Sequence, residues 1–306
     1  MGSKLLYYLV LLPLSRMPYF ILYGVSDVLR FFLYYLVRYR RKVVEDNLRK
    51  CFPEKGDEWL KKVSKKFYKH LADLVLESIK NFSIGREETQ RRMKGIDREV
   101  VERFAKENRS IIICGGHYGN WELWAMASAD QVSHKVIGVY KKLNNDFFDR
   151  KMKESRGKFG MTLVPTNESG AFLREHPDML KGVVLAFDQS PANPERGIWV
   201  DFLGRKTASY FGTEKYAKDF DLPVVYGHLT KVKRGFYEVR YELICEHPKE
   251  TGFGEITRQL YGILEEEIHR EPAYWLWSHK RWKHRPPDEA ADFSPKKEAT
   301  VDLSRK

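Results

Sequence analysis

Cysteine is scarce in this 306-residue chain, and the few cysteines present show no paired spacing. Cys51, Cys114 and Cys245 are odd in number, lie far apart and form no C-x-x-C pair. Such spacing suggests neither a disulfide framework nor a zinc site. The histidines form no H-E-x-x-H pattern, so we expect no metal. A reducing cytoplasm is the compartment that fits this composition best.

Acidic residues are too few to balance the basic ones. The chain has 54 Lys and Arg against 42 Asp and Glu, a formal net charge of +12. This excess favours an anionic partner, which can be nucleic acid, an acidic membrane surface or an acidic carrier protein. Hydrophobic residues make up 42% of the chain, which is ample for a buried core. The sequence therefore predicts a globular, basic protein.

The apolar N-terminus lacks the small-residue cleavage site of a secretory signal and is too long for one. Within residues 19–37, Asp27 and Arg30 would each cost about 2.5 to 3.5 kcal/mol at the centre of a bilayer. On a helix these charges share one stripe, and the other faces are apolar; the stripe is completed by Tyr23, Tyr34, Arg38 and Arg41. Residues 1–37 are therefore predicted to be a membrane anchor, either interfacial or a span whose stripe packs on protein. A soluble core helix is the alternative.

Basic residues follow the predicted anchor directly, at Arg38, Arg40, Arg41 and Lys42, which places the main domain on the cytoplasmic side by the positive-inside rule. Residues 38–69 hold twelve Lys or Arg and five Asp or Glu. Their lysines gather on one face of a helix predicted for residues 57–82, at Lys61, Lys62, Lys65, Lys66 and Lys69. This face is either simply solvated or in contact with lipid headgroups.

Apolar runs alternate with amphipathic ones over the rest of the chain. Buried strands are predicted at 110–114, 135–140, 162–165, 182–188 and 222–230, and an edge strand at 235–245. Further helices are predicted at 97–107, 121–129, 145–158, 168–175, 210–220 and 253–270. The alternation predicts an α/β fold with a mostly parallel central sheet flanked by helices. The main domain would cover residues 38–285, and the polar tail 286–306 is expected to be disordered.

The stretch from Ile111 to Glu122 is the most informative for chemistry. A buried strand ends in two glycines, then His117 and Glu122 follow five residues apart, with Asn120 as a helix N-cap between them. Ligands bind outside the carboxyl ends of strands in open α/β sheets, so His117 would lie at a site. We expect Glu122 to orient His117 as a general base for acyl transfer from a thioester to a hydroxyl. A satisfied structural pair is the alternative.

The oxyanion of such a reaction also needs hydrogen-bond donors. Backbone N–H groups from Gly119 to Trp121, with Lys141 or Lys142, are the candidates. Cys114 could serve as an acyl-accepting nucleophile, but it ends a run of three isoleucines, so packing is favoured.

Several separated motifs together resemble the late lipid A acyltransferases of bacteria, of lauroyl and myristoyl type, within the lysophospholipid and glycerophosphate acyltransferase superfamily. They are GGHYGNWE from Gly115, VYKKLNN from Val139, AFDQS from Ala186, DFLGRKTASYFGT from Asp201 and AYWLWSHKRWK from Ala273. The resemblance implies acyl carrier protein thioester, or acyl coenzyme A, as a co-substrate without any cofactor. It implies a lipid A precursor as the acceptor and the cytoplasmic side of the bacterial inner membrane as the location.

The resemblance also implies roles for individual residues. His117 and Glu122 match the catalytic pair, and Asp188 matches an acidic position near the cleft. The substrate-binding candidates are Asn120, Lys141, Arg156, Asp188, Gln189 and Arg205; arginine is common in the family where this chain has Lys141, and lysine loses bidentate recognition of an anion. The aromatic and basic segment 274–283 is favoured as core or lipid packing over a site for single-stranded nucleic acid.

Two other functions stay open at this point. One is an acyltransferase with a glycerophospholipid or aminolipid acceptor. The other is a non-enzymatic protein that binds membrane or nucleic acid through its basic surface. The acyl chain length and the oligomeric state are not determined by the sequence.

Overall fold

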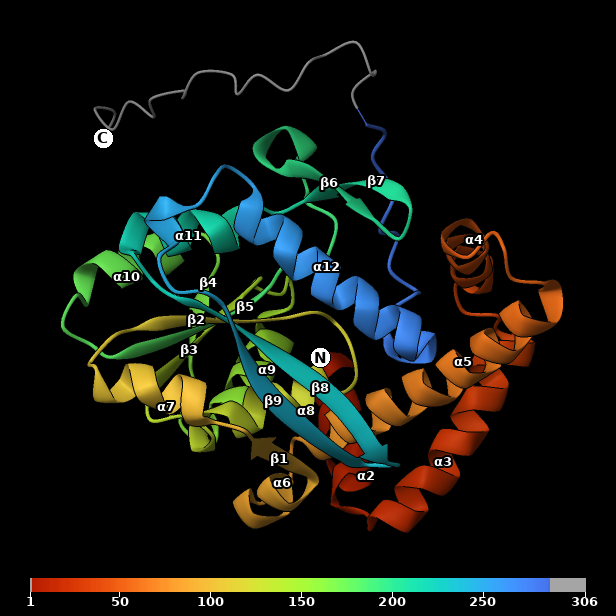
Figure 1. The fold of residues 1–306 in the computed structure, drawn as a ribbon. Helices are drawn as coiled ribbons and strands as arrows, with labels where there is room; N and C mark the ends of the chain where they lie inside the picture. The colour runs from red at the N-terminus through yellow and green to blue at the C-terminus, as the bar shows by residue number, and fades with distance from the viewer. Residues whose placement is uncertain (1, 287–306) are drawn as a thin grey trace.

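The computed structural model describes residues 2–286, and it has an α/β architecture built on a seven-stranded sheet (Figure 1). The strand order is β1-β9-β8-β2-β5-β3-β4, and every neighbouring pair is parallel except β8 and β9. The strands are β1 (Met93–Ile96), β2 (Ile111–Gly115), β3 (Lys135–Tyr140), β4 (Thr162–Pro165), β5 (Lys181–Ala186), β8 (Val224–Lys233) and β9 (Phe236–Cys245). The prediction of a mostly parallel sheet is confirmed.

The strands differ from the prediction in two respects. The strand predicted at the edge, β9, lies inside the sheet because β1 pairs with it in parallel. Four residues with the sequence MKGI are too short to stand out as a strand. A separate antiparallel hairpin, β6 (Ile198–Phe202) and β7 (Arg205–Ser209), was also not predicted. The predicted tail lies outside the described residues, apart from its first position.

Helices cover both faces of the sheet (Figure 1). Those of the main domain are α4 (Arg41–Cys51), α5 (Asp57–Lys80), α6 (Arg86–Arg92), α7 (Glu99–Lys106), α8 (Trp121–Ala127), α9 (Asp146–Gly157), α10 (Ser169–Glu175), α11 (Gly212–Phe220) and α12 (Glu255–Arg270). The end of β2 shows the two layers: a Cβ on Gly115 would meet Trp124 of α8, and one on Gly116 would meet Leu264 of α12. Both glycines are needed so that a helix can pack closely on each face.

The N-terminal segment consists of short helical pieces: α1 (Gly2–Leu6), the π-helical η1 (Tyr7–Leu11), α2 (Leu12–Arg16), α3 (Tyr19–Phe31) and the π-helical η2 (Phe32–Leu36). By length and composition, Tyr19–Leu36 is the one described helical stretch apolar enough to cross a membrane, and 17% of it is buried in the protein. Its outward side chains include Phe20, Val28 and Leu36. The chain therefore has the predicted N-terminal apolar helix.

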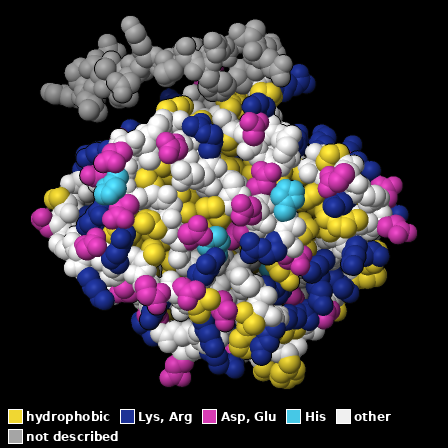
Figure 2. All heavy atoms as spheres, viewed as in Figure 1, with side chains coloured by type: hydrophobic (Ala, Val, Ile, Leu, Met, Phe, Trp, Pro, Cys, Tyr) yellow, Lys and Arg dark blue, Asp and Glu magenta, His cyan; other side chains and the backbone are white. Residues whose placement is uncertain are grey.

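Helix α3 lies alongside α5 (Figure 1). Its predicted polar stripe faces protein at Tyr23, which bonds Glu77, and at Asp27, which pairs with Arg234; Arg30 remains exposed. On α5 the five predicted lysines are exposed, and the opposite apolar face is buried. Figure 2 shows basic and hydrophobic side chains intermixed on the side of the molecule where these helices lie.

The indole of Trp124 fixes α8 against the sheet. It lies between Gly115 of β2 and Gly227 of β8, and a Cβ built on Gly227 would be 2.5 Å from Trp124 Cζ2. Its Nε1 donates to the hydroxyl of Tyr241 at 3.3 Å. Because α8 begins directly after the segment of His117, this packing also holds the backbone that carries the histidine.

Gly227→Ala should lower the free energy of unfolding by about 1 to 3 kcal/mol, because the added methyl group overlaps the indole. In a Trp124→Phe background, which lacks the overlapping ring atoms, the same change should cost less than about 1 kcal/mol. Denaturant unfolding of the four chains measures both costs. Equal costs in the two backgrounds would show that the indole does not limit this position.

Candidate active site

Parallel pairing of β2 with β5 brings the two halves of the site together. Gly115 at the end of β2 is in register with Ala186 at the end of β5. The residues that follow each strand therefore meet at the same edge of the sheet. They are His117 on one side and Asp188 with Gln189 on the other.

The His117 imidazole is held by Asp188. Its Nδ1 lies 2.6 Å from Asp188 Oδ1, and the other carboxylate oxygen accepts from the His117 backbone N–H at 2.9 Å and from Trp275 Nε1 at 2.7 Å. Asp188 is 2% exposed. Burial opposes its charge, yet the histidine and these donors lower the pKa of Asp188 to about 2. The carboxylate is therefore ionised, and Nδ1 carries a proton that it donates.

The same contact acts on the histidine. Burial alone would lower the pKa of His117, but the charge and hydrogen bond of Asp188 outweigh burial and raise that pKa above its ordinary value. Gln189 Nε2 lies 3.0 Å from His117 Nε2, and an amide nitrogen can only donate. Nε2 therefore carries the lone pair, as a general base requires. Trp121 packs edge-on against the imidazole with ring centroids 5.1 Å apart.

The expectation that Glu122 orients His117 is wrong in its geometry. Glu122 forms a bidentate pair with Arg156 of α9, with Nη2 to Oε1 at 2.7 Å and Nε to Oε2 at 3.0 Å. Its first-turn position on α8 points it toward α9, whereas Asp188 reaches Nδ1 from the loop that follows the neighbouring strand β5. Glu122 still acts on His117 through its charge, which raises the pKa of the histidine less than Asp188 does.

Asn120 caps α8 as predicted, since its Oδ1 accepts from the Leu123 N–H at 2.9 Å. It is fully buried and its amide faces Glu77, so the predicted substrate contact by Asn120 is wrong. The backbone N–H of Gly119 donates to the carbonyl of Tyr274 at 3.1 Å. That N–H is therefore not free to act as the predicted oxyanion donor.

Three other candidates lie apart from the dyad that His117 forms with Asp188. Lys141 is exposed just after β3, and Lys142 pairs with Asp146 at 3.5 Å. Arg205 lies on β7 with its guanidinium 4.5 Å from the centre of the Trp282 ring. Neither Lys141 nor Arg205 has a hydrogen bond to His117, Asp188 or Gln189 among the described residues, and their substrate-binding roles remain predictions. Cys114 is fully buried, and burial raises the pKa of its thiol, in agreement with a packing role.

The C-terminal segment supplies two site residues that sequence reasoning did not single out. Trp275 donates to Asp188, and His279 Nε2 accepts from the Ser190 N–H at 3.0 Å, which fixes the loop after Gln189. Trp275 and Trp277 are buried, as expected for packing. The segment also forms an antiparallel bridge with Tyr118, the residue after His117. The aromatic residues of segment 274–283 were the signal in the sequence, but they do not indicate a hydrogen bond to Asp188.

The fold and the dyad together define an α/β enzyme with a carboxylate-oriented histidine at the carboxyl ends of parallel strands. The family model of the bacterial lipid A biosynthesis acyltransferases matches residues 2–284. The chain belongs to this family, and it is an acyltransferase. A purely non-enzymatic role is thereby set aside.

Similar proteins include two from Escherichia coli (strain K12). The lipid A biosynthesis palmitoleoyltransferase is 22% identical over 270 residues, which cover 82% of this chain and 81% of that protein. The lipid A biosynthesis lauroyltransferase is 22% identical over 283 residues, which cover 90% of each. The similarity therefore extends over most of this chain and most of each relative.

His117→Ala should reduce turnover by about 10² to 10⁴, the usual contribution of a general base. Asp188→Asn should lose nearly as much, because an amide cannot stabilise the imidazolium that forms. Glu122→Gln should lose less than Asp188→Asn, since Glu122 does not bond the imidazole. Steady-state turnover of variants with wild-type melting temperatures measures this order. A folded His117→Ala enzyme with more than about a tenth of wild-type turnover contradicts the role of the base.

The pH dependence should follow the histidine. A base must be neutral, so kcat/KM should fall as pH drops through the His117 pKa, which lies above its ordinary value of about 6.5. Asp188→Asn removes the charge that raises this pKa while burial remains, so its acid limb should move to lower pH. Glu122→Gln should move it less in the same direction. A limb that stays in place in Asp188→Asn would show that another group titrates.

Proposed function

We propose that the protein is a membrane-associated acyltransferase that moves a fatty acyl chain from an acyl carrier protein thioester to a hydroxyl of a lipid A precursor. The His117–Asp188 dyad is the observation that carries the proposal, because it supplies the base that a hydroxyl acceptor needs. Family membership supports the substrate class, since the relatives are named for acyl transfer in lipid A biosynthesis.

The chemistry follows from the tautomer. His117 Nε2 takes the proton of the acceptor hydroxyl while the hydroxyl oxygen attacks the thioester carbonyl carbon. Asp188 stabilises the resulting imidazolium. The oxyanion then collapses, the C–S bond breaks, and the imidazolium returns the proton to the departing thiolate. Atoms and charges balance without a covalent enzyme intermediate. The acceptor hydroxyl must first displace the Gln189 amide from Nε2, which leaves that amide free to donate to the thioester oxyanion.

Arg156 is the cation that Glu122 holds beside this chemistry. Two of its three nitrogens bind that carboxylate, which fixes the planar guanidinium in one orientation. We assign Glu122 the role of orienting Arg156 toward an anionic group of donor or acceptor. This replaces its predicted role as the partner of His117.

The surface of the N-terminal half supports membrane association. Apolar side chains point outward along α1, η1, α3 and η2, while Tyr23, Ser26 and Asp27 of α3 are bound to the protein. This arrangement favours a helix that lies in the membrane interface with its apolar face in lipid. The exposed lysines of α5 lie on the adjacent helix and suit lipid phosphate or an acidic carrier protein. The cytoplasmic side of the bacterial inner membrane is the proposed location.

The test uses the purified full chain in lipid vesicles with acyl carrier protein thioester as donor. A lipid A precursor and a glycerophospholipid with a free hydroxyl are offered together, and mass spectrometry follows which one gains the acyl mass. We expect the gain on the lipid A precursor and its loss by at least about 10² in His117→Ala. A gain only on the glycerophospholipid would assign the chain to that acceptor instead. Faster transfer from acyl coenzyme A would overturn the choice of donor.

A further inference from the structure

Three buried polar residues line one face of α5, next to the loop between His117 and Glu122, which we call the catalytic segment. His70, Asp73 and Glu77 follow the i, i+3, i+7 spacing of a single helix face, and each is at most 4% exposed. Buried ionisable groups are costly unless they are hydrogen-bonded or paired. A face that needed only to pack on its neighbours would be better served by apolar side chains, so these three groups call for an explanation.

Glu77 and His70 bind two consecutive residues of the loop between His117 and Glu122. Glu77 Oε2 accepts from Asn120 Nδ2 at 2.6 Å, and the other end of that side chain caps α8. His70 Nε2 lies 3.0 Å from the Gly119 carbonyl oxygen. Burial and the charge of Lys231 lower the pKa of His70 to about 3, so it is neutral and donates through Nε2. The backbone just after His117 is thus held from α5.

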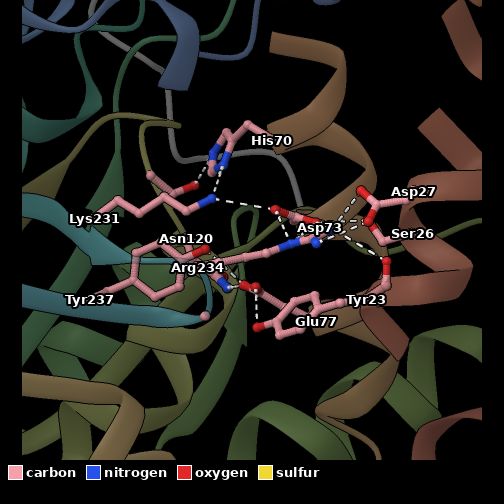
Figure 3. Close-up of polar contacts among 12 residues, drawn as sticks. Tyr23, Ser26, Asp27, His70, Asp73, Glu77, Asn120, Lys231, Arg234 and Tyr237 are labelled. Carbon is pink, nitrogen blue, oxygen red and sulfur yellow. Dashed lines mark hydrogen bonds and ion pairs between the residues drawn. The ribbon is translucent and has the colours of Figure 1, made fainter. Parts of the chain in front are cut away.

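The same face of α5 also binds the N-terminal helix (Figure 3). The Tyr23 hydroxyl of α3 donates to Glu77 Oε1 at 3.0 Å, and the Ser26 hydroxyl donates to Asp73 Oδ1 at 2.8 Å. Arg234, in the turn between β8 and β9, bonds both Asp73 at 2.6 Å and Asp27 at 3.0 Å. Glu77 therefore binds the catalytic segment with one oxygen and α3 with the other.

We propose that Glu77 is a positioning residue for acyl transfer: through Asn120 it fixes the segment that carries His117, and through Tyr23 it couples that segment to the apolar helix α3. Tyr237 donates a third hydrogen bond, at 2.8 Å to Oε2, so that both carboxylate oxygens are engaged. The position of α3 against α5 then affects the orientation of the His117 imidazole. The proposal rests on His117 acting as the base, which the His117→Ala measurement tests separately.

A carboxylate swap tests the first link. Asn120→Asp keeps the α8 cap but places a second buried carboxylate against Glu77, so kcat should fall by at least about tenfold. Glu77→Gln alone should stay within about threefold of wild type, because the amide oxygen can still accept from Asn120 and Tyr237. The double variant should recover to within about threefold, since the amide introduced at position 77 can donate to the carboxylate introduced at position 120. The KM values for donor and acceptor should change little throughout.

Tyr23→Phe tests the second link and does not depend on the folding of Asn120→Asp. It removes only the hydroxyl that bonds Glu77, so kcat should fall by about threefold to tenfold while binding to vesicles is unchanged. Tyr35→Phe is the matched control, because Tyr35 lies on the same helical stretch with 47% exposure. Its kcat should match the wild type. Melting temperatures of all variants separate lost positioning from lost folding.

Three results would overturn the proposal. The first is a double variant no more active than folded Asn120→Asp, which would show that the carboxylate contact does not control the base. The second is a Tyr23→Phe enzyme with the same kcat as Tyr35→Phe, which would show that α3 is not coupled to the site. A fall in activity that only parallels a fall in melting temperature would likewise reduce Glu77 to a structural residue.

Discussion

The hydrogen bond between His117 and Asp188 is the contact on which the arrangement of the site depends. It exists because β2 and β5 pair in parallel with Gly115 opposite Ala186, so that the residues after both strands meet. Helices α8 and α12 cover this pairing. They approach so closely that there is no room for a side chain at position 115 or 116, and both residues are glycine. A change in any of these layers would move the imidazole relative to its carboxylate.

Two carboxylates near His117 have different tasks because their surroundings differ. Asp188 is buried, bonds Nδ1 and the Trp275 indole, and remains ionised at low pH. Glu122 is partly exposed and is paired with Arg156. In the proposed mechanism the first fixes the tautomer and stabilises the imidazolium, while the second holds the Arg156 cation near the reacting groups. Spacing in sequence does not separate these roles, since Glu122 is five residues from the histidine and Asp188 follows another strand.

The N-terminal segment combines two surfaces that a simple span would not need. Its outer side chains are mostly apolar, and its inner face is bound to α5 and to the β8–β9 turn through Tyr23, Ser26 and Asp27. In the proposed function, a helix bound in this way to the main domain would keep that domain close to the lipid surface, where a lipid acceptor would be reached. Of these contacts, the one made by Tyr23 reaches Glu77, which in turn bonds Asn120 in the loop after His117.

Elements with a local signal could be predicted from the sequence alone. Periodicity gave α5 with its buried and lysine faces and the β2, β3, β4, β5 and β8 strands, and the motif order gave the family, with His117 at the end of a buried strand. The inner position of β9 and the short β1 were missed because pairing partners leave no local pattern. Which carboxylate holds His117 depends on long-range packing, since Asp188, Trp275 and His279 come from distant segments that meet at one sheet edge. Asn120 was predicted correctly as a cap, yet its contact with Glu77, 43 residues earlier, depends on the packing of α5 behind the site.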